Sequence, residues 1–429
     1  MNLGKAKIRA VLLVALTLGL LPFLSGDEAR ADVAALRAEL ENRQSKIAEL
    51  EQEIAAYQEQ IEKEASNAQT LTGEIRRVEA TINKLKADIR LTTNRIAASE
   101  LTIEEISDTI AGQEVNIGER REAIGTSLRT IGEIEAQSLV EILLANANLS
   151  VFFSSLNDLE RLEEELRVDM LQLQELNKQL RAKKDAKEKE KTQMESLRLE
   201  LADRSRIEEQ AKRSKDRLLS ETKNREVAYQ QLLEDRLQKK NALEEELRGI
   251  EEEIRIAIDP ESLPQTGSGV LMWPLDEVKI TQYFGNTTFA TANPQIYNGK
   301  GHNGIDLRAS PGTLVKAAEE GVVVGIGNTD EQCNGVSYGK WVLIEHQNNL
   351  STLYAHLSLS RARMGERVFR GDIIGYSGNT GYTTGPHLHF AVFASKGVRV
   401  DQYRSRVCGT LMTLPLASYN SYLNPLSYL

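Results

Sequence analysis

Four of the five histidines in the 429-residue chain lie in short patterns that could hold or assist a metal ion. His302 and Asp306 are four residues apart in the segment GHNGID, and His387 and His389 are two apart in GPHLHF. Even offsets place the side chains of each pair on one face of a β-strand. Imidazole nitrogen and carboxylate oxygen are ligands that suit zinc, so the two pairs together predict a zinc site.

The number of ligands in these patterns is typical of a catalytic zinc site. Two histidines and one aspartate leave a fourth tetrahedral position open for water, whose pKa zinc lowers to roughly 7. Two further histidines then remain to transfer protons and to stabilise an oxyanion. The third pattern, LYAHLS, places His356 at the end of a β-type run. His346, the fifth histidine, is predicted to be an ordinary turn or strand residue.

Short β-type runs separated by glycine-rich turns surround these histidines. They predict an antiparallel β domain over residues 270–429. The runs are residues 279–284, 321–326, 341–345, 351–356, 372–376 and 387–393.

Several segments of this domain resemble the lysostaphin/LytM family of zinc peptidoglycan endopeptidases. They are GHNGIDLRA, STLYAHLS, GYSGNTGYTTGPHLHF and the opening MWPL…ITQYFG. The resemblance implies that His302, Asp306 and His389 bind zinc, and that His356 and His387 are catalytic. Some relatives have lost ligands and only activate other hydrolases. Because all five positions are complete here, an active endopeptidase is favoured over a non-hydrolytic EnvC-like activator of a murein amidase.

Two features depart from the short members of that family. Residues 328–337 form a longer connection, and the tail after Val400 has no counterpart. The only two cysteines, Cys333 and Cys408, lie in these two features. Export would permit a disulfide between them, which would tie the tail to the loop; the alternative is two unrelated thiols.

The N-terminal half has a heptad repeat. Every seventh residue from Ile47 to Ile131 is isoleucine in twelve of thirteen cases, and Ala68 is the exception. Such a repeat predicts a long helix with a left-handed supercoiled seam. No proline interrupts it between Pro22 and Pro260.

The heptads break at the apolar stretch 139–156 and resume in a new phase from Leu159. Two helical arms joined at this tip predict an antiparallel hairpin, and the alternative is one continuous helix in a parallel dimer. The tip is either a packed cap or a docking surface for a membrane partner. The resulting fold class is α+β multidomain, with a long antiparallel α-helical coiled coil followed by an antiparallel β-sheet peptidase domain.

The remaining segments complete the predicted organisation. Residues 1–31 read as a signal peptide, with an uncleaved membrane anchor as the alternative, so the chain is expected at the cell wall, periplasmic or extracellular. Residues 32–258 form the hairpin, and residues 259–269, rich in proline and glycine, form a linker.

Charge is distributed unevenly along the chain. Residues 270–429 carry 13 Lys and Arg against 11 Asp and Glu, a net charge of +2. Because the whole chain has a net charge of −10, residues 1–269 have a net charge of −12. The acidic half argues against nucleic-acid binding. The combination of coil and peptidase domain resembles division-associated proteins of the EnvC and PcsB type. This resemblance implies a membrane partner of FtsEX type.

Overall fold

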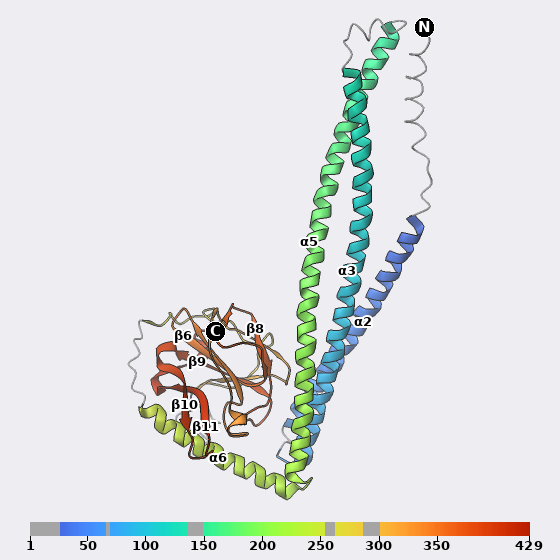
Figure 1. Cartoon of the computed structure of the whole chain (residues 1–429). Coiled ribbons are helices and arrows are strands. Elements are labelled where there is room, and N and C mark those ends of the chain that lie inside the picture. Colours follow the sequence, from blue (N-terminus) through green and yellow to red (C-terminus); the bar gives the residue numbers. More distant parts are fainter. Residues whose placement is uncertain (1–25, 66–68, 136–148, 254–261, 286–300) are drawn as a thin grey trace. The chain divides into compact units, whose positions relative to one another are not determined.

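The computed structural model describes residues 26–65, 69–135, 149–253, 262–285 and 301–429 (Figure 1). The chain divides into two compact units. One contains residues 1–48 and 92–199, and the other contains residues 49–91 and 200–429. Long antiparallel helices precede an antiparallel sheet, which confirms the predicted fold class.

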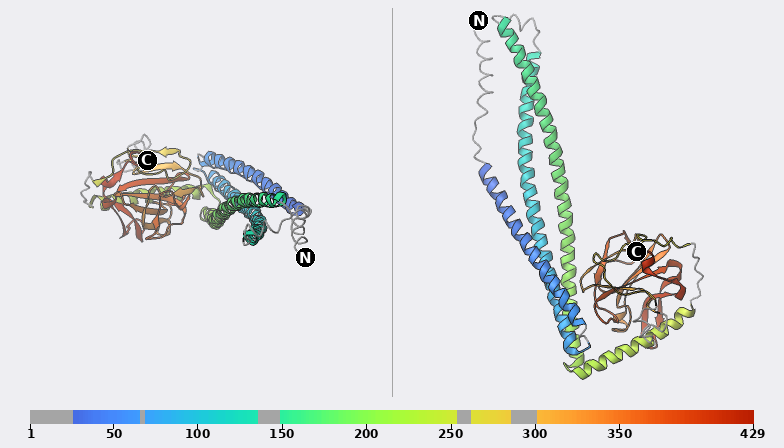
Figure 2. Two further views of the ribbon diagram at one scale, coloured as in Figure 1. Left: turned by 90° about the horizontal axis from the view of Figure 1, so that it is seen from above. Right: turned by 180° about the vertical axis from the view of Figure 1, so that it is seen from behind.

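The helices are α2 (Gly26–Ala65), α3 (Leu71–Glu135), α5 (Leu149–Thr222) and α6 (Glu226–Glu253). Helices α3 and α5 run side by side in Figure 2. Their contacts show opposite directions, because Glu100 of α3 pairs with Arg198 of α5 whereas Arg120 pairs with Asp169. Most heptad isoleucines of α3 on this stretch are buried, namely Ile96, Ile110, Ile117, Ile124 and Ile131, as expected for a helix seam. The antiparallel hairpin is therefore formed within one chain.

The first predicted arm is divided into two helices. Helix α2 ends at Ala65, and α3 begins after Thr70, whose hydroxyl accepts a hydrogen bond from the backbone N–H of Gly73. Arg43 of α2 donates to Asn94 of α3 at 3.1 Å and Glu53 pairs with Arg90, so these two helices are antiparallel too. The expectation of one continuous first arm was wrong, because the heptad phase continues across the break and hides it. Ala68, the exceptional heptad position, lies outside the described residues.

The second predicted arm also ends earlier than the heptads suggest. Lys223 and Asn224 have φ angles of 48° and 55°, and this left-handed pair separates α5 from α6. Such angles are uncommon for residues other than glycine, and they end a helix sharply.

The C-terminal domain, residues 270–429, is built on one antiparallel sheet. Its central order is β1-β2-β9-β6-β5-β4-β7; β8 pairs with β3 and β6, and β12 pairs with β9. The strands are β1 (Ile280–Gln282), β2 (Ile305–Arg308), β3 (Leu314–Lys316), β4 (Gly321–Asn328), β5 (Lys340–His346), β6 (Leu350–Ser360), β7 (Arg367–Val368), β8 (Ile373–Ser377), β9 (His387–Ala394) and β12 (Tyr422–Leu423). Strands β10 (Val398–Arg404) and β11 (Leu411–Ala417) form a separate hairpin.

Both faces of the central strands are covered. Tyr354 of β6 and Phe390 of β9 belong to one hydrophobic cluster, whereas Leu353 and Ala391 belong to another. Alternate residues of a strand point to opposite faces. Burial on both sides explains why β6 and β9 read as continuous apolar runs, and it fixes the strands that carry the histidines.

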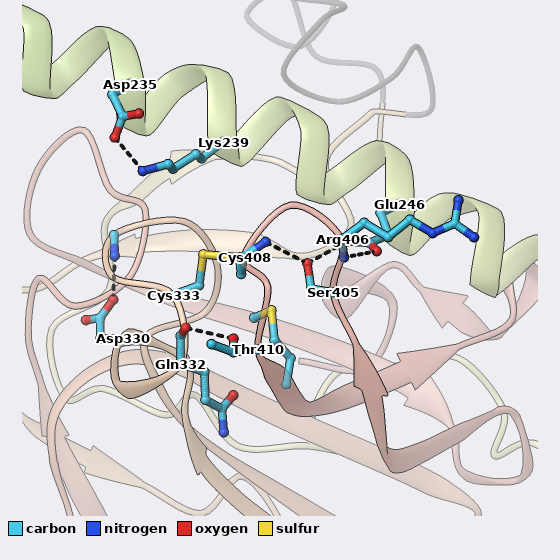
Figure 3. The surroundings of a disulfide bond; sticks show 12 residues. Asp235, Lys239, Glu246, Asp330, Gln332, Cys333, Ser405, Arg406, Cys408 and Thr410 are labelled. Carbon is cyan, nitrogen blue, oxygen red and sulfur yellow. Dashed lines mark hydrogen bonds and ion pairs between the residues drawn. A yellow bond between two sulfur atoms is a disulfide. The ribbon is translucent and has the colours of Figure 1, made fainter.

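The predicted disulfide joins Cys333 to Cys408, with 5.6 Å between their Cα atoms (Figure 3). Cys333 lies in the long connection between β4 and β5, and Cys408 lies in the turn between β10 and β11. The bridge therefore ties the additional hairpin to the additional loop. The hairpin also packs on α6, whose Leu243 is fully buried against Met412 and Leu414.

The predicted linker is partly attached to the domain. Backbone N–H groups of Gly267 and Gly269 donate to the carbonyls of Ser427 and Leu429 at 2.9 and 3.2 Å. Residues 1–25 of the predicted signal peptide, residues 139–148 of the predicted tip and residues 259–261 of the predicted linker lie outside the described residues. Within the described part of the chain, no helix combines the length and the apolar character needed to cross a membrane.

Candidate metal centre and active site

Pairing between β2 and β9 brings the two sequence patterns together. Asp306 of β2 lies directly opposite His389 of β9 in the antiparallel register. Strand β6 flanks β9 on its other side, where Ala355 lies opposite His389. His356 is the next residue along β6. A backbone β-bridge between Gly285 and His302 holds His302 just before the start of β2. All five predicted site residues thus meet at one edge of three adjacent strands.

Three atoms converge as metal ligands would. His302 Nε2 lies 3.1 Å from His389 Nδ1, His389 Nδ1 lies 3.0 Å from Asp306 Oδ1, and Asp306 Oδ1 lies 3.2 Å from His302 Nε2. A tetrahedral zinc with bonds of about 2.0–2.1 Å would separate its ligand atoms by about 3.3 Å. All three side chains are buried, and the His–Asp–His donor set suits zinc. The residues therefore fit the metal.

The ring of His302 is oriented by a hydrogen bond on its far side. Its Nδ1 lies 3.1 Å from the carbonyl oxygen of Tyr283. A carbonyl only accepts, so Nδ1 carries the proton and Nε2 presents its lone pair. Such outer partners fix the tautomer of ligating histidines.

Gly304 makes room for the ring of His389. A Cβ on Gly304 would lie 2.6 Å from the carbonyl oxygen of Phe390 and 2.8 Å from His389 Cε1. Both contacts are too short for any side chain. The glycine within the HxxxD pattern is thus needed for the close packing of β2 and β9 at the site.

The carboxyl group of Asp306 is held in its charged form. Burial alone would raise the pKa of Asp306. The nearby His387 and His302, together with hydrogen bonds from His302 and His389, have the larger effect and hold this pKa well below its usual range. A carboxylate that stays ionised is available as a ligand over the whole neutral pH range.

His356 and His387 lie beside the three converging residues. Their ring centroids are 4.7 Å apart, and His387 Nε2 lies 3.6 Å from Asp306 Oδ1. Each Nδ1 contacts a backbone carbonyl, that of Thr380 at 2.8 Å for His356 and that of Gly385 at 2.7 Å for His387. Both rings are thereby fixed with the proton on Nδ1, which leaves Nε2 as the free nitrogen.

The backbone of His356 is unusual. Its φ is 60°, in the left-handed region that residues other than glycine seldom adopt. Burial, followed by the neighbouring His387 and His389, lowers the pKa of His356 well below the usual histidine value. The imidazole is consequently neutral at physiological pH.

His346 lies apart from this group. Its Nδ1 contacts the carbonyl of Glu320 at 2.9 Å and its Nε2 contacts the hydroxyl of Thr352 at 2.8 Å. Both nitrogens are occupied at the end of β5, as expected for an ordinary strand residue.

Several groups at the site were not predicted from the sequence. The carbonyls of Tyr283, Thr380 and Gly385 carry no signal in the sequence, because every residue has one. Tyr338 is the other omission. Its ring lies 6.0 Å from that of His389, and its hydroxyl accepts a hydrogen bond from Asn303 at 3.3 Å. Its place in the long connection could have drawn attention to it.

A cavity of about 950 Å³ opens beside His387 and Asp306. Residues 384–387 and the edge of β1 form part of its wall, and Glu62 and Lys84 of the helices contribute to the rest. This volume is within the range of sites that hold extended organic ligands.

The part of the chain that carries the five site residues is similar in sequence to known proteins. Residues 300–402 match Peptidase family M23. DD-carboxypeptidase/endopeptidase Mpg of Neisseria meningitidis is 37% identical over 126 residues, which are 29% of this chain and 27% of that protein. Peptidoglycan DD-endopeptidase ShyA of Vibrio cholerae is 44% identical over 106 residues, 25% of this chain and 23% of that protein. The chain thus spans about a quarter of the length of these relatives.

A similar solved structure is that of the antimicrobial peptidase lysostaphin from Staphylococcus simulans. It is 25% identical, with a TM-score of 0.26, and the alignment covers 38% of this chain and 53% of that one.

Proposed function

We propose that the protein is a zinc-dependent endopeptidase that hydrolyses peptide bonds of peptidoglycan, because its residues 300–402 match Peptidase family M23. The observation that carries this proposal is the convergence of His302 Nε2, Asp306 Oδ1 and His389 Nδ1 within 3.2 Å of one another. Zinc held there would lower the pKa of a water molecule to roughly 7 and polarise a peptide carbonyl. The names of the relatives Mpg and ShyA support the choice of substrate.

In this proposal His356 and His387 transfer protons through Nε2. Backbone carbonyls hold the other ring nitrogen of each, so neither ring can turn away or exchange its tautomer. The lowered pKa of His356 leaves its Nε2 able to accept a proton at neutral pH. A protonated Nε2 on either ring could in turn donate a hydrogen bond to an oxyanion or a proton to the departing amine.

The second candidate is a protein that activates a murein amidase without hydrolysing anything itself. A binding domain has no need of three converging ligand atoms with two further histidines of fixed tautomer. The geometry therefore favours hydrolysis.

Incubation of the zinc-loaded full chain with cross-linked peptidoglycan separates the two candidates. An endopeptidase converts cross-linked muropeptide dimers to monomers with new amino termini and leaves the bond between glycan and peptide intact, as mass spectrometry would show. If zinc is bound and cross-linked material remains unchanged until an amidase is added, the activator is the correct description.

In this proposal the protein is exported and acts in cell-wall remodelling or division. The helical arm is a regulatory element, and its apolar tip at residues 139–156 docks on a membrane-bound partner of FtsEX type. The antiparallel pairing of α3 and α5 supports it, because the tip lies in the sequence between these two paired helices. Replacing Phe152 and Phe153 with Ser tests the idea. If the variant melts like the wild type and its cells have a normal cell wall, the tip is only a packed cap of the hairpin.

A further inference from the structure

The long connection between β4 and β5 packs directly on the loop that precedes β9. A Cβ on Gly381 would lie 2.0 Å from the carbonyl oxygen of Ser337, and one on Gly339 would lie 2.3 Å from the carbonyl carbon of Thr380. Both glycines have positive φ, 71° and 62°. The two loops, residues 328–340 and 378–382, are therefore in backbone contact, and their relative position is fixed closely.

One carboxylate fastens the two loops together. Asp330 Oδ1 accepts a hydrogen bond from the backbone N–H of Gly335 at 2.8 Å, within its own loop (Figure 3). Asp330 Oδ2 accepts one from the backbone N–H of Gly381 at 2.9 Å, in the facing loop. Both oxygens are thus used as acceptors, and charged acceptors make the stronger hydrogen bonds.

His356 is held by one carbonyl from each of these loops. Its backbone N–H donates to the carbonyl of Tyr338 at 2.9 Å, and its ring Nδ1 lies 2.8 Å from the carbonyl of Thr380. The first contact supports the left-handed backbone of His356, and the second fixes its tautomer. A change in the distance between the loops would disturb both contacts together.

The far side of the long connection is anchored as well. Cys333 is bonded to Cys408, and the side chain and carbonyl of Gln332 accept hydrogen bonds from Thr413 N and Thr410 Oγ1 (Figure 3). Asp330 therefore connects the anchored part of the long connection to the facing loop 378–382. A displacement of either segment would displace the other segment through Asp330.

We propose that Asp330 is a positioning residue that sets the place and the tautomer of His356 by joining the loops 328–340 and 378–382. The inference rests on the proposed endopeptidase function, in which His356 transfers protons. The two side-chain oxygens of Asp330 accept hydrogen bonds from the backbone of the two loops, so Asp330 would act on His356 through these loops.

The variant Asp330→Asn tests this role at almost constant volume. An amide has one acceptor oxygen, so its NH2 group would face one of the two N–H donors and that hydrogen bond would be lost. Glu331→Gln is the matched control, because Glu331 is exposed and its carboxylate contacts Asn328. Asp330→Glu keeps both acceptors on a longer side chain and serves as the rescue variant.

We expect Asp330→Asn to lower kcat roughly 10- to 100-fold at nearly unchanged KM and zinc content, the effect of a misplaced catalytic group. Asp330→Glu should recover part of this loss, and Glu331→Gln should behave as wild type. Hydrogen exchange measured by mass spectrometry should be faster in Asp330→Asn for the peptides that contain His356 and Gly381.

Hydrogen exchange decides the structural part independently of activity. If both peptides exchange in Asp330→Asn as they do in wild type, or if kcat is unchanged, Asp330 does not position His356. An equal loss of kcat in Glu331→Gln would also overturn the inference. If the zinc-loaded wild type hydrolyses nothing, the proposed function fails, while the exchange result still decides whether Asp330 joins the loops.

Discussion

The helical arm and the C-terminal β domain encode structure in different ways. In the arm, one residue type at one spacing forms the seam, and isoleucines such as Ile110, Ile117 and Ile124 have equivalent places. In the domain, each of the five site side chains has its own set of partners and a single place. The arm therefore resists single changes because its contacts are many and alike, whereas the site depends on atoms that nothing else replaces.

Removing a ligand should have the largest effect. His389→Ala takes away the atom that lies about equally far from the other two ligand atoms, so zinc and activity should both fall to background. Zinc can be counted by mass spectrometry of the native protein. His346→Gln, at a histidine outside the site, is the control and should retain zinc. Full zinc occupancy in His389→Ala would show that this histidine is no ligand.

Loss of a proton-transferring histidine should have the next largest effect. His356→Ala and His387→Ala should each keep the metal but lower kcat by roughly 10²- to 10⁴-fold, the range for a lost general base or oxyanion donor. Steady-state kinetics with zinc analysis on the same samples checks this. Loss of zinc from His356→Ala would make it a ligand instead.

One glycine variant in each region allows the site and the helical arm to be compared directly. Gly304→Ala places a Cβ against Phe390 O and the His389 ring, so we expect zinc affinity to fall by about 10- to 100-fold. Gly112→Ala in α3 meets no described heavy atom within 4 Å and should raise helix stability by about 0.5–1 kcal/mol. Chelator competition and thermal melting measure these changes. Equal zinc affinity in the two variants would contradict the tight packing at Gly304.

The disulfide should contribute to stability more than to chemistry. Replacing Cys333 and Cys408 with Ser opens a loop with a sequence separation of 75 residues, at a cost of up to roughly 4 kcal/mol in the chain-entropy model. Melting of the variant against wild type gives the difference. Two thiols titrated in the denatured, oxidised wild type would mean that the bridge does not form.

A single change in the seam should have the smallest effect. Ile117→Val and Ile124→Val each remove one buried methyl group and should cost about 0.5–1.5 kcal/mol, with no change in kcat. Circular dichroism melting of both variants measures it. A markedly different cost at the two sites would show that the heptad positions are not equivalent.

The sequence predicts those features that repeat or lie close together along the chain. Heptads indicated the seam, and the HxxxD and HxH spacings indicated which side chains share a strand face. The break between Ala65 and Leu71 was missed, because the heptad phase is the same on both sides of it.

Strand register and backbone contacts between distant parts of the chain were beyond such reasoning. The pairing of Asp306 with His389 depends on the neighbouring positions of β2 and β9, and the hydrogen bond from Gly381 to Asp330 depends on two loops meeting. Backbone carbonyls such as that of Thr380 carry no residue-specific signal at all. The residues of the site could therefore be named from the sequence, but the groups that orient them could not.

Anomalous scattering at the zinc edge, from crystals of the zinc-loaded full chain, tests the central claim most directly. We predict one anomalous peak about 2.0–2.2 Å from His302 Nε2, Asp306 Oδ1 and His389 Nδ1. A peak at other residues, or none at these three with zinc in excess, would contradict the account.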